Sequence, residues 1–383
     1  LHTRKIANQA SEVSVMTARN KRFRQIGQVI HKAGKGRNRL WVAVLFCLTL
    51  SVFLQLAARN LPGFGEWYGT ALYPVLVGTI GRFWGLFPFS ASEIGIYLLA
   101  AGFLILFVCC ILKRTSPFRP VCLTASLLFL LYTVNCGVNY YRTPFSAHMG
   151  LEIKQSTAEE LENLCIFLTD QVNRLSEDGV DAAMSLSQAG EEGVKAMEAM
   201  GEDFWPLNGY YPRPKPVLCS WILSVQQLCG IYSPFTIEAN YNRFMPDYNI
   251  PHTICHELSH LRGFMREDEA NFIGYLACIR SESPQFQYSG YLTGWVYATN
   301  ALYRTDAQAY SRVRARLNEK AQEDLRENNA FWGQYEGKVA EAANQLNDAY
   351  LKINSQDQGV ASYGQAVDLM LAYAREYQGV NSR

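Results

Sequence analysis

Histidine is scarce in this chain of 383 residues, and cysteine lacks the spacing of a disulfide scaffold. Only six histidines are present, so their gathering in one short segment carries information. The ten cysteines include no CxxC pair, and those after residue 142 are odd in number, which argues against a dense disulfide framework. A bridge between Cys219 and Cys229 is the pairing left open.

Acidic residues are nearly missing from the N-terminal arm, residues 1–39, where Glu12 is the only one. The arm carries many basic side chains: Arg19, Lys21, Arg22, Arg24, Lys32, Lys35, Arg37 and Arg39. The net charge of the whole chain is only +1, and the arm runs straight into an apolar segment. We therefore predict a cytoplasmic flank of a membrane helix and no nucleic-acid partner.

Charge is absent from three long runs at 41–58, 94–112 and 121–141. At about 1.5 Å per residue each run is long enough to cross the hydrocarbon core of a bilayer. We predict three transmembrane helices within a membrane domain at 40–141. Because no small-residue cleavage site follows the first run, a removed signal peptide is the weaker alternative. The sequence begins with Leu1, and we expect Met16 to be a candidate translation start.

The segment 61–92 is rich in aromatic residues and glycine, but Arg82 interrupts its apolar run. We predict an interfacial or re-entrant segment, with a fourth span as the alternative. The loop between the second and third spans contains Lys113, Arg114 and Arg119 and no acid, so the positive-inside rule places it in the cytoplasm. Three crossings then predict a multi-pass cell-membrane protein whose residues 142–383 lie outside the cytoplasm.

Three of the six histidines lie within nine residues, at His252, His256 and His260. The last two belong to an HExxH motif with Glu257. On an α-helix, residues four apart point the same way, so His256 and His260 can share one metal ion while Glu257 projects beside it. This spacing predicts a Zn²⁺ site with a catalytic water, in which Glu257 is the general base and then the acid.

The third metal ligand is predicted to be Glu267. Arg266 stands where HExxHxxGxxH enzymes have their third histidine, and a guanidinium cannot coordinate a metal. We expect Gly263 to end the first helix in a left-handed conformation and a second helix to begin near Arg266. In that helix Asn271 lies one turn after Glu267 and is expected to accept the N–H of a ligating histidine. Glu269 is the reserve ligand, although the helix dipole alone also favours acids here.

Other candidate site residues rest on weaker patterns. His252 shares the helical face of His256, so it either contacts substrate or an extra water, or lies partly exposed in the first helical turn. An oxyanion-stabilising group is expected opposite the base. Among 22 tyrosines the candidates are Tyr288, Tyr291 and Tyr363.

The soluble part is expected to be mainly helical with a small sheet, an α+β arrangement, in which Cys255 and Cys278 pack behind the two metal helices. Alternation from Phe235 predicts a strand just upstream of the HExxH helix, which either binds extended substrate as an edge strand or is purely structural. Periodicity predicts helices at 156–175, 181–200 and 365–377 and a pair of amphipathic helices covering the core at 305–350. The prolines and glycines at 209–216 predict an irregular or extended connection.

Three local signatures carry a resemblance to a known family: SPF-T-EA beginning at Ser233, the HExxH motif, and EDEANF beginning at Glu267. With GVASYG at 359–364, they resemble a family of bacterial polytopic membrane proteins catalogued as domain of unknown function 3810. This resemblance implies a fold but no activity. Separately, Glu267-x-x-Ala270-Asn271 is similar to the third-ligand helix of HtpX-like and ImmA-type metallopeptidases, which implies that Glu267 binds zinc. The short distance from His260 to Glu267 departs from those groups.

We therefore expect three N-terminal transmembrane helices followed by a zincin-like, mostly helical metallopeptidase domain in a bacterial cell membrane. The predicted function is that of a zinc-dependent metallohydrolase, a gluzincin-like endopeptidase acting on a peptide or protein substrate. Two alternatives stay open. One is a non-catalytic metal-binding sensor or assembly protein, and the other is a zinc amidase acting on cell-wall or lipid substrates.

Overall fold

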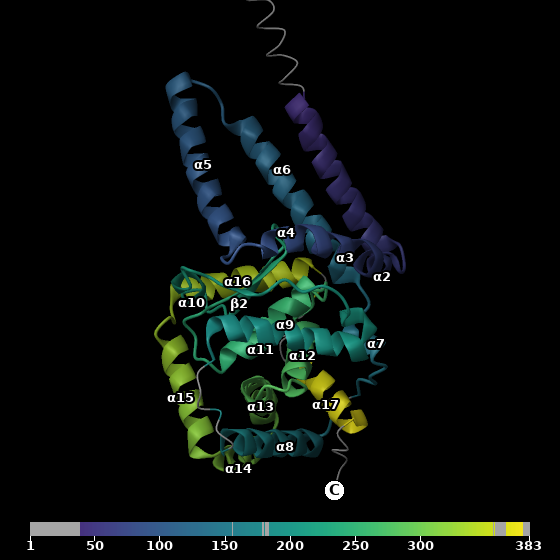
Figure 1. The fold of residues 1–383 in the computed structure, drawn as a ribbon, viewed down its shortest axis with the longest axis vertical. Coiled ribbons are helices and arrows are strands. Elements are labelled where there is room, and N and C mark those ends of the chain that lie inside the picture. The colour runs from purple at the N-terminus through teal and green to yellow at the C-terminus, as the bar shows by residue number, and fades with distance from the viewer. Residues whose placement is uncertain are drawn as a thin grey trace, which may run out of the picture. The chain divides into compact units, whose positions relative to one another are not determined.

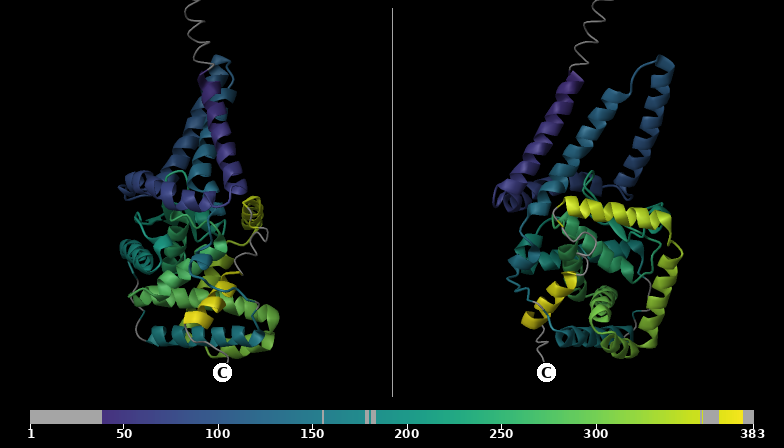
Figure 2. Two further views of the ribbon diagram at one scale, coloured as in Figure 1. Left: turned by 90° about the vertical axis from the view of Figure 1, so that its right-hand side faces the viewer. Right: turned by 180° about the vertical axis from the view of Figure 1, so that it is seen from behind.

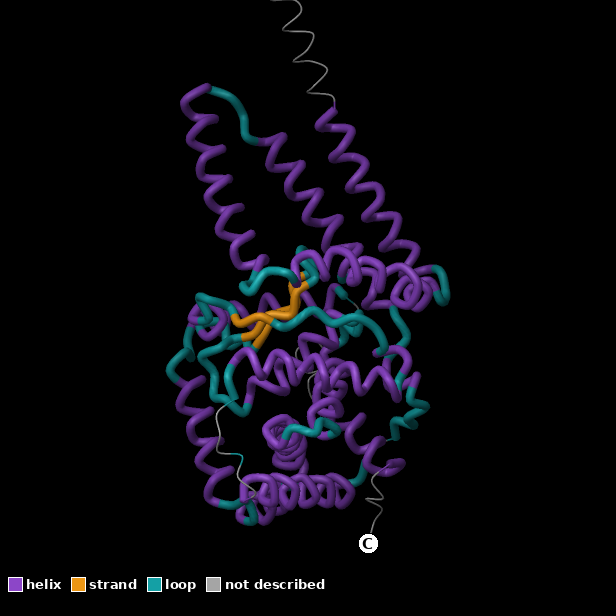
Figure 3. Tube along the Cα trace, in the orientation of Figure 1, coloured by secondary structure: helices purple, strands orange, loops and turns teal. Residues whose placement is uncertain are grey.

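The computed structural model describes residues 39–154, 156–177, 180, 184–354, 356 and 365–377. The described chain is mainly helical with one small sheet, as Figure 3 shows, which confirms the predicted fold class. It divides into two compact units, Leu1–Phe53 with Phe103–Leu130, and Leu54–Gly102 with Leu131–Arg383. The basic arm at 1–38 lies outside the described residues.

Among the described residues, three helices are long and apolar enough to cross a membrane: Arg39–Asn60, Ala91–Lys113 (α5) and Phe118–Tyr141. The three predicted spans are confirmed to this extent. The third has an unpredicted break, because α6 ends at Asn135 and a short 3₁₀ helix follows at Gly137–Tyr141. Within the first unit, the rings of Trp41 and Phe118 pack 6.1 Å apart.

The segment 61–92 is a helical run and is not one of the candidate spans among the described residues. One face of the run packs into the second unit, where Tyr68 and Tyr73 are each 1% exposed. The Tyr73 hydroxyl donates to the carbonyl of Leu261 (3.0 Å) and contacts the Tyr232 hydroxyl (2.8 Å). Its pieces are α2 (Phe64–Trp67), π-helical Tyr68–Leu72, α3 (Tyr73–Leu76), π-helical Val77–Gly81 and α4 (Arg82–Gly85).

The second unit is built around helices that stack below this segment in Figure 1. A capping box begins α8, where the Glu160 N–H donates to Thr157 Oγ1 (3.1 Å) and the Thr157 N–H donates to Glu160 Oε2 (2.9 Å). The helices are α7 (Phe145–His148), α8 (Ala158–Glu177), α9 (Leu186–Asp203), α10 (Trp221–Ser224), α11 (Asn249–Leu261), α12 (Glu267–Ile279), α13 (Pro284–Thr305) and α17 (Ala366–Tyr377).

The sheet has three short strands in the order β1-β3-β2: β1 (Lys215–Pro216), β2 (Gly230–Ser233) and β3 (Glu238–Tyr241). β1 pairs with β3 in parallel, and β2 pairs with β3 antiparallel with Ile231 opposite Asn240. The prediction of a strand from Phe235 was wrong at its start, because residues 234–237 form the turn between β2 and β3. Pro234 cannot donate a ladder hydrogen bond, and Ile237 has a left-handed φ of 53°.

Residues 305–350 form three helices, α14 (Ala307–Ala315), α15 (Glu319–Gly333) and α16 (Lys338–Ile353), where a pair was predicted. α14 and α15 bury apolar side chains such as Val313 and Leu325 in the core. In α16 only Leu351 is buried. The expectation that this region packs over the core is therefore wrong for α16.

Candidate metal centre

The HExxH motif lies on α11, and the acidic cluster opens α12. Gly263 has a φ of 103°, a left-handed conformation that a β-carbon would strain, and it reverses the chain between the two helices. The predicted turn and the helix beginning next to Arg266 are confirmed. Both helices are almost wholly buried, and Cys255 and Cys278 are fully buried, as expected. All ten cysteines lie in the described chain as free thiols, Cys219 and Cys229 included.

His256, His260 and Glu267 converge on one point. Their potential ligand atoms all lie within 4.8 Å of one another. Glu267 Oε2 lies 3.3 Å from His256 Nε2, and Glu267 Oε1 lies 3.6 Å from His260 Nε2. Ligands held about 2.0–2.1 Å from a tetrahedral zinc ion lie about 3.3–3.4 Å apart. The spacing of these side chains therefore fits a metal ion of this size.

His260 is oriented by the turn that follows its own helix. Its Nδ1 lies 2.8 Å from the carbonyl of Phe264, and a carbonyl only accepts, so Nδ1 carries the proton and donates. Nε2 is then the nitrogen available to a metal. Asn271, predicted to accept the N–H of a ligating histidine, is not the acceptor for His260, because the turn at Gly263 places the Phe264 carbonyl in that position. The side-chain oxygen of Asn271 instead accepts from the Tyr297 hydroxyl (3.1 Å).

Glu257 is buried against the edge strand β2. A β-carbon at Gly230 would lie 2.5 Å from Glu257 Oε1, so only glycine permits this approach of strand and carboxylate. Burial raises the pKa of Glu257 to about 7, although His256, His260 and the Tyr232 N–H act in the opposite direction. Glu257 Oε2 is buried and has no hydrogen-bond partner among the described residues. Such a carboxylate is suited to accepting a proton from water.

The ionisation states of His260 and Glu267 depend strongly on each other. Burial disfavours the charged form of His260, but the Glu267 carboxylate outweighs it and raises the pKa of His260 to about 9. Burial also disfavours the charged form of Glu267, but the positive charge of His260 overcomes this effect and holds the pKa of Glu267 well below its usual range. The cluster thus pairs the buried Glu267 carboxylate with a protonated His260 imidazole. A divalent cation can take the place of that proton.

A family model described as "Protein of unknown function (DUF3810)" matches residues 68–371. The chain belongs to this family. The matched range contains α11 and α12, two of the three candidate spans and α16. No curated protein matches the chain, and no solved structure matches it. For this DUF3810 chain the chemistry of the site must therefore be argued from its own side chains.

Glu269, the predicted reserve ligand, lies away from the two histidines of the cluster. Its carboxylate accepts from the Ser146 hydroxyl (2.6 Å) and the Ser146 N–H (3.0 Å), which fixes α7 to α12. The neighbouring Asp268 pairs with the Arg266 guanidinium at 2.9 Å. Of the three consecutive acids only Glu267 faces the histidines, because successive residues of a helix point about 100° apart.

His252 is buried, which contradicts the alternative that it is partly exposed in the first turn. Its Nε2 lies 3.3 Å from the backbone carbonyl of Asn271, and its ring packs edge-on against Tyr297 with centroids 6.0 Å apart. Burial lowers the pKa of His252 to about 3, helped by His256. His252 therefore lies beside the cluster as a neutral ring.

Tyr297 lies beside the metal cluster, where its hydroxyl donates to Asn271 and its ring packs against His252, and sequence reasoning did not select it. Burial raises its pKa, and the Glu267 carboxylate adds to the shift. Of the candidates proposed from sequence, Tyr288 donates to Asp324 Oδ2 (2.5 Å), and Tyr291 packs against Phe167 and Tyr275. Tyr363 lies outside the described residues. No sequence pattern distinguishes Tyr297, because only the packing of α13 across α11 and α12 brings it here.

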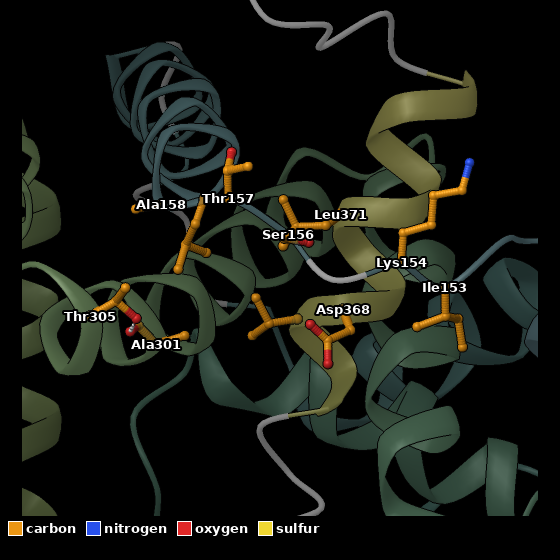
Figure 4. Close-up of a pocket in the computed structure, with 11 residues that line it drawn as sticks. Ile153, Lys154, Ser156, Thr157, Ala158, Ala301, Thr305, Asp368 and Leu371 are labelled. Atoms are coloured by element: carbon orange, nitrogen blue, oxygen red, sulfur yellow. Dashed lines mark hydrogen bonds between the residues drawn. The ribbon is translucent and has the colours of Figure 1, made fainter.

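A cavity of about 360 Å³ lies away from the metal cluster, between the start of α8, the end of α13 and α17. Figure 4 shows Thr157, Thr305 and Asp368 around it. None of the metal-cluster residues lines this cavity, so it is a site separate from the candidate metal centre.

Proposed function

We propose that this chain is a membrane-anchored, zinc-dependent metallohydrolase, most simply an endopeptidase of the gluzincin kind. The observation that carries the proposal is the convergence of His256, His260 and Glu267 beside the buried Glu257. A structural zinc site has no use for a nearby unpaired carboxylate, whereas a hydrolytic site requires a base. The buried, unpartnered Glu257 Oε2 therefore favours catalysis over a purely structural or sensing role.

His256 Nε2, His260 Nε2 and a Glu267 carboxylate oxygen would hold the zinc ion. Two imidazoles and one carboxylate form a donor set that leaves a fourth position open in catalytic zinc sites. When bound, zinc supplies a Lewis acid that acidifies water and polarises a carbonyl group. The hydrogen bond from His260 Nδ1 to the Phe264 carbonyl fixes this imidazole in the tautomer that binds through Nε2.

Glu257 would transfer the proton of the reaction. Its carboxylate would take a proton from the attacking water and then donate it to the leaving amine. The environment suits this task, because burial raises the pKa of Glu257 to about 7 and a base works best near the ambient pH. The edge strand β2 lies beside this carboxylate, and its Ile231 is 47% exposed. An extended peptide could pair with such a strand.

The catalytic unit is proposed to lie on the outer side of a bacterial cell membrane. Lys113, Arg114 and Arg119 form a basic loop between the second and third spans, and the N-terminal arm is also basic. Both are expected in the cytoplasm by the positive-inside rule. Three crossings then bring residues after the third span to the outer side. Cysteine accessibility to a membrane-impermeant reagent in whole cells tests this arrangement.

The deciding experiment measures zinc content and hydrolysis together on the detergent-purified full chain and on Glu257→Gln. We expect about one zinc per chain in both proteins, since Glu257 is not a ligand. Hydrolysis of a peptide library should fall by about 10²- to 10⁴-fold in the variant, the usual contribution of a general base. Glu269→Gln is the matched control, because this buried acid lies on the neighbouring helix α12 but pairs with Ser146.

Other outcomes decide between the alternatives. Zinc binding with no hydrolysis of peptides, lipids or cell-wall fragments by wild type would favour a metal-binding sensor or assembly protein. Hydrolysis of cell-wall or lipid amides alone, abolished in Glu257→Gln, would favour an amidase with the same chemistry. Failure of both wild type and variant to bind zinc would overturn the proposal.

A further inference from the structure

Helix α16 presents its apolar side chains to the surroundings instead of to the core. Of its 16 residues only Leu351 is buried. Val339, Leu346 and Ile353 are 59%, 73% and 71% exposed. Isolated helices of this length are only marginally stable in water, and most helices in proteins depend on packing of an apolar face. The helix therefore requires a partner for that face.

The exposed apolar residues form one continuous stripe. Val339, Leu346 and Ile353 are spaced seven residues apart, which returns a helix to nearly the same direction after two turns. The exposed residues Ala342 and Ala349 lie between them on this side, whereas Tyr350, at the border of the stripe, packs inward against Tyr132 and Tyr140. The opposite side carries Glu341, Asn344, Asp348 and Lys352, and the buried Leu351 also points away from the stripe. The helix is amphipathic with its apolar face turned outward.

The C-terminal end of α16 is fixed to the ends of two candidate membrane spans within the second unit. Arg59, in the last turn of Arg39–Asn60, donates to the Ile353 carbonyl (3.5 Å). Tyr132, in the last turn of α6, which ends at Asn135, donates to Asn354 Oδ1 (2.7 Å), and its ring packs against that of Tyr350 with centroids 6.2 Å apart. The end of a membrane span lies at the level of the lipid headgroups.

A second segment exposes apolar side chains at the same end of the second unit. In Figures 1 and 2, α16 and the run from α2 to α4 both lie at this end. Val75 is 56% exposed and Phe83 53%, and Leu86, directly after α4, is 76% exposed. Large exposed apolar surfaces on a chain with membrane spans are typical of lipid contact.

We propose that α16 is a membrane-surface helix that lays its stripe of Val339, Leu346 and Ile353 into the interfacial layer of the bilayer. The occupant is lipid because the helix is attached to the ends of the spans, where lipid is the neighbouring phase. The polar side faces away from the hydrocarbon, and on that side Lys352 pairs with Asp348 at 2.7 Å. This inference is independent of hydrolysis and of zinc.

The test is site-specific photocrosslinking of the full chain in nanodiscs of phosphatidylcholine and phosphatidylglycerol. Benzoylphenylalanine is placed at position 346 on the stripe or, as the matched control, at position 344 on the opposite side; both residues are exposed. We expect lipid adducts, identified by mass spectrometry, to be several-fold more abundant from position 346. Position 353 should behave like position 346, since it is two turns further along the same face.

Two results would overturn the proposal. One is an equal yield of lipid adducts from positions 344 and 346. The other is a crosslink from position 346 to a second copy of the chain, seen as a covalent dimer, which would assign the stripe to self-association. Because the readout is lipid contact, failure here would leave the proposed hydrolase activity unaffected.

Discussion

Helices α11 and α16 are both amphipathic, yet they have opposite relations to the interior. Eleven of the 13 residues of α11 are buried, including ionisable ones, whereas one of the 16 residues of α16 is buried. Buried ionisable groups are costly unless they are paired or used. Exposed apolar stripes are equally unfavourable in water. This difference is the one that the two proposed roles require: ionisable groups held in a buried site on α11, and an apolar face turned to a non-aqueous neighbour on α16.

The contrast extends to the acids that open α12. Glu267 and Glu269 are two residues apart, but Glu267 faces two imidazoles and Glu269 faces Ser146. The pKa of Glu267 is held low by His260 against the effect of burial, whereas burial raises the pKa of Glu269. Of these two carboxylates, only that of Glu267 is placed to bind a cation together with the histidines. Its neighbour contributes to the packing of α7.

The largest expected effect is on the stability of the buried helix. Leu258 of α11 is fully buried, so Leu258→Ala should lower the free energy of unfolding by about 2–5 kcal/mol, the range for buried leucines. Denaturant unfolding of the full chain in detergent, followed by tryptophan fluorescence, measures this. A loss below about 0.5 kcal/mol would mean that α11 is not part of a close-packed core.

The two acids of α12 should differ in metal binding. Replacing a residue that only orients a zinc ligand lowers zinc affinity about 10- to 100-fold. Because Glu267→Gln removes a ligand, we expect it to lower zinc affinity by more than about 100-fold, or about 2.7 kcal/mol. Glu269→Gln should retain zinc, because the new side-chain amide can still accept from Ser146. Competition with a chromogenic chelator gives both affinities. The reverse order would transfer the ligand role to Glu269.

The contact between β2 and Glu257 should be sensitive to one methyl group. In Gly230→Ala the new β-carbon would displace the Glu257 carboxylate, and a misplacement of about 1 Å can lower a rate by about 100-fold. We expect hydrolysis to fall about 10- to 100-fold with zinc content unchanged. Gly333→Ala on α15, where nothing lies within 4 Å of the added carbon, is the control. Equal activities of the two variants would argue against Glu257 as the base.

The smallest effect on stability is expected for a substitution in α16. Leu346→Ala removes the same atoms as Leu258→Ala, but Leu346 is 73% exposed. The free energy of unfolding in detergent should change by less than about 0.5 kcal/mol, as for surface substitutions in general. A loss comparable to that of Leu258→Ala would show that the stripe packs against protein, and the contrast between the two helices would disappear.

Sequence patterns predicted the spans, the two metal helices, the turn at Gly263 and the choice of Glu267, since each follows from local periodicity or backbone preference. Predictions from sequence patterns failed where a contact between residues distant in the chain decided the role of a side chain. Asn271 has the spacing of an orienting residue, but the Phe264 carbonyl occupies that position. Tyr297 is one of 22 tyrosines, and nothing in its neighbourhood along the chain sets it apart. The alternation from Phe235 continued through a turn that Pro234 and Ile237 impose.

The sequence by itself determined that His256 and His260 point the same way, because 3.6 residues per turn fixes their relative direction. It also determined that three segments are apolar enough to cross a membrane. Only the tertiary structure decided that the Phe264 carbonyl accepts from His260, that β2 closes on Glu257, and that the apolar side of α16 faces outward. Those features depend on which faces of distant elements meet, and helical periodicity defines a face without specifying its partner.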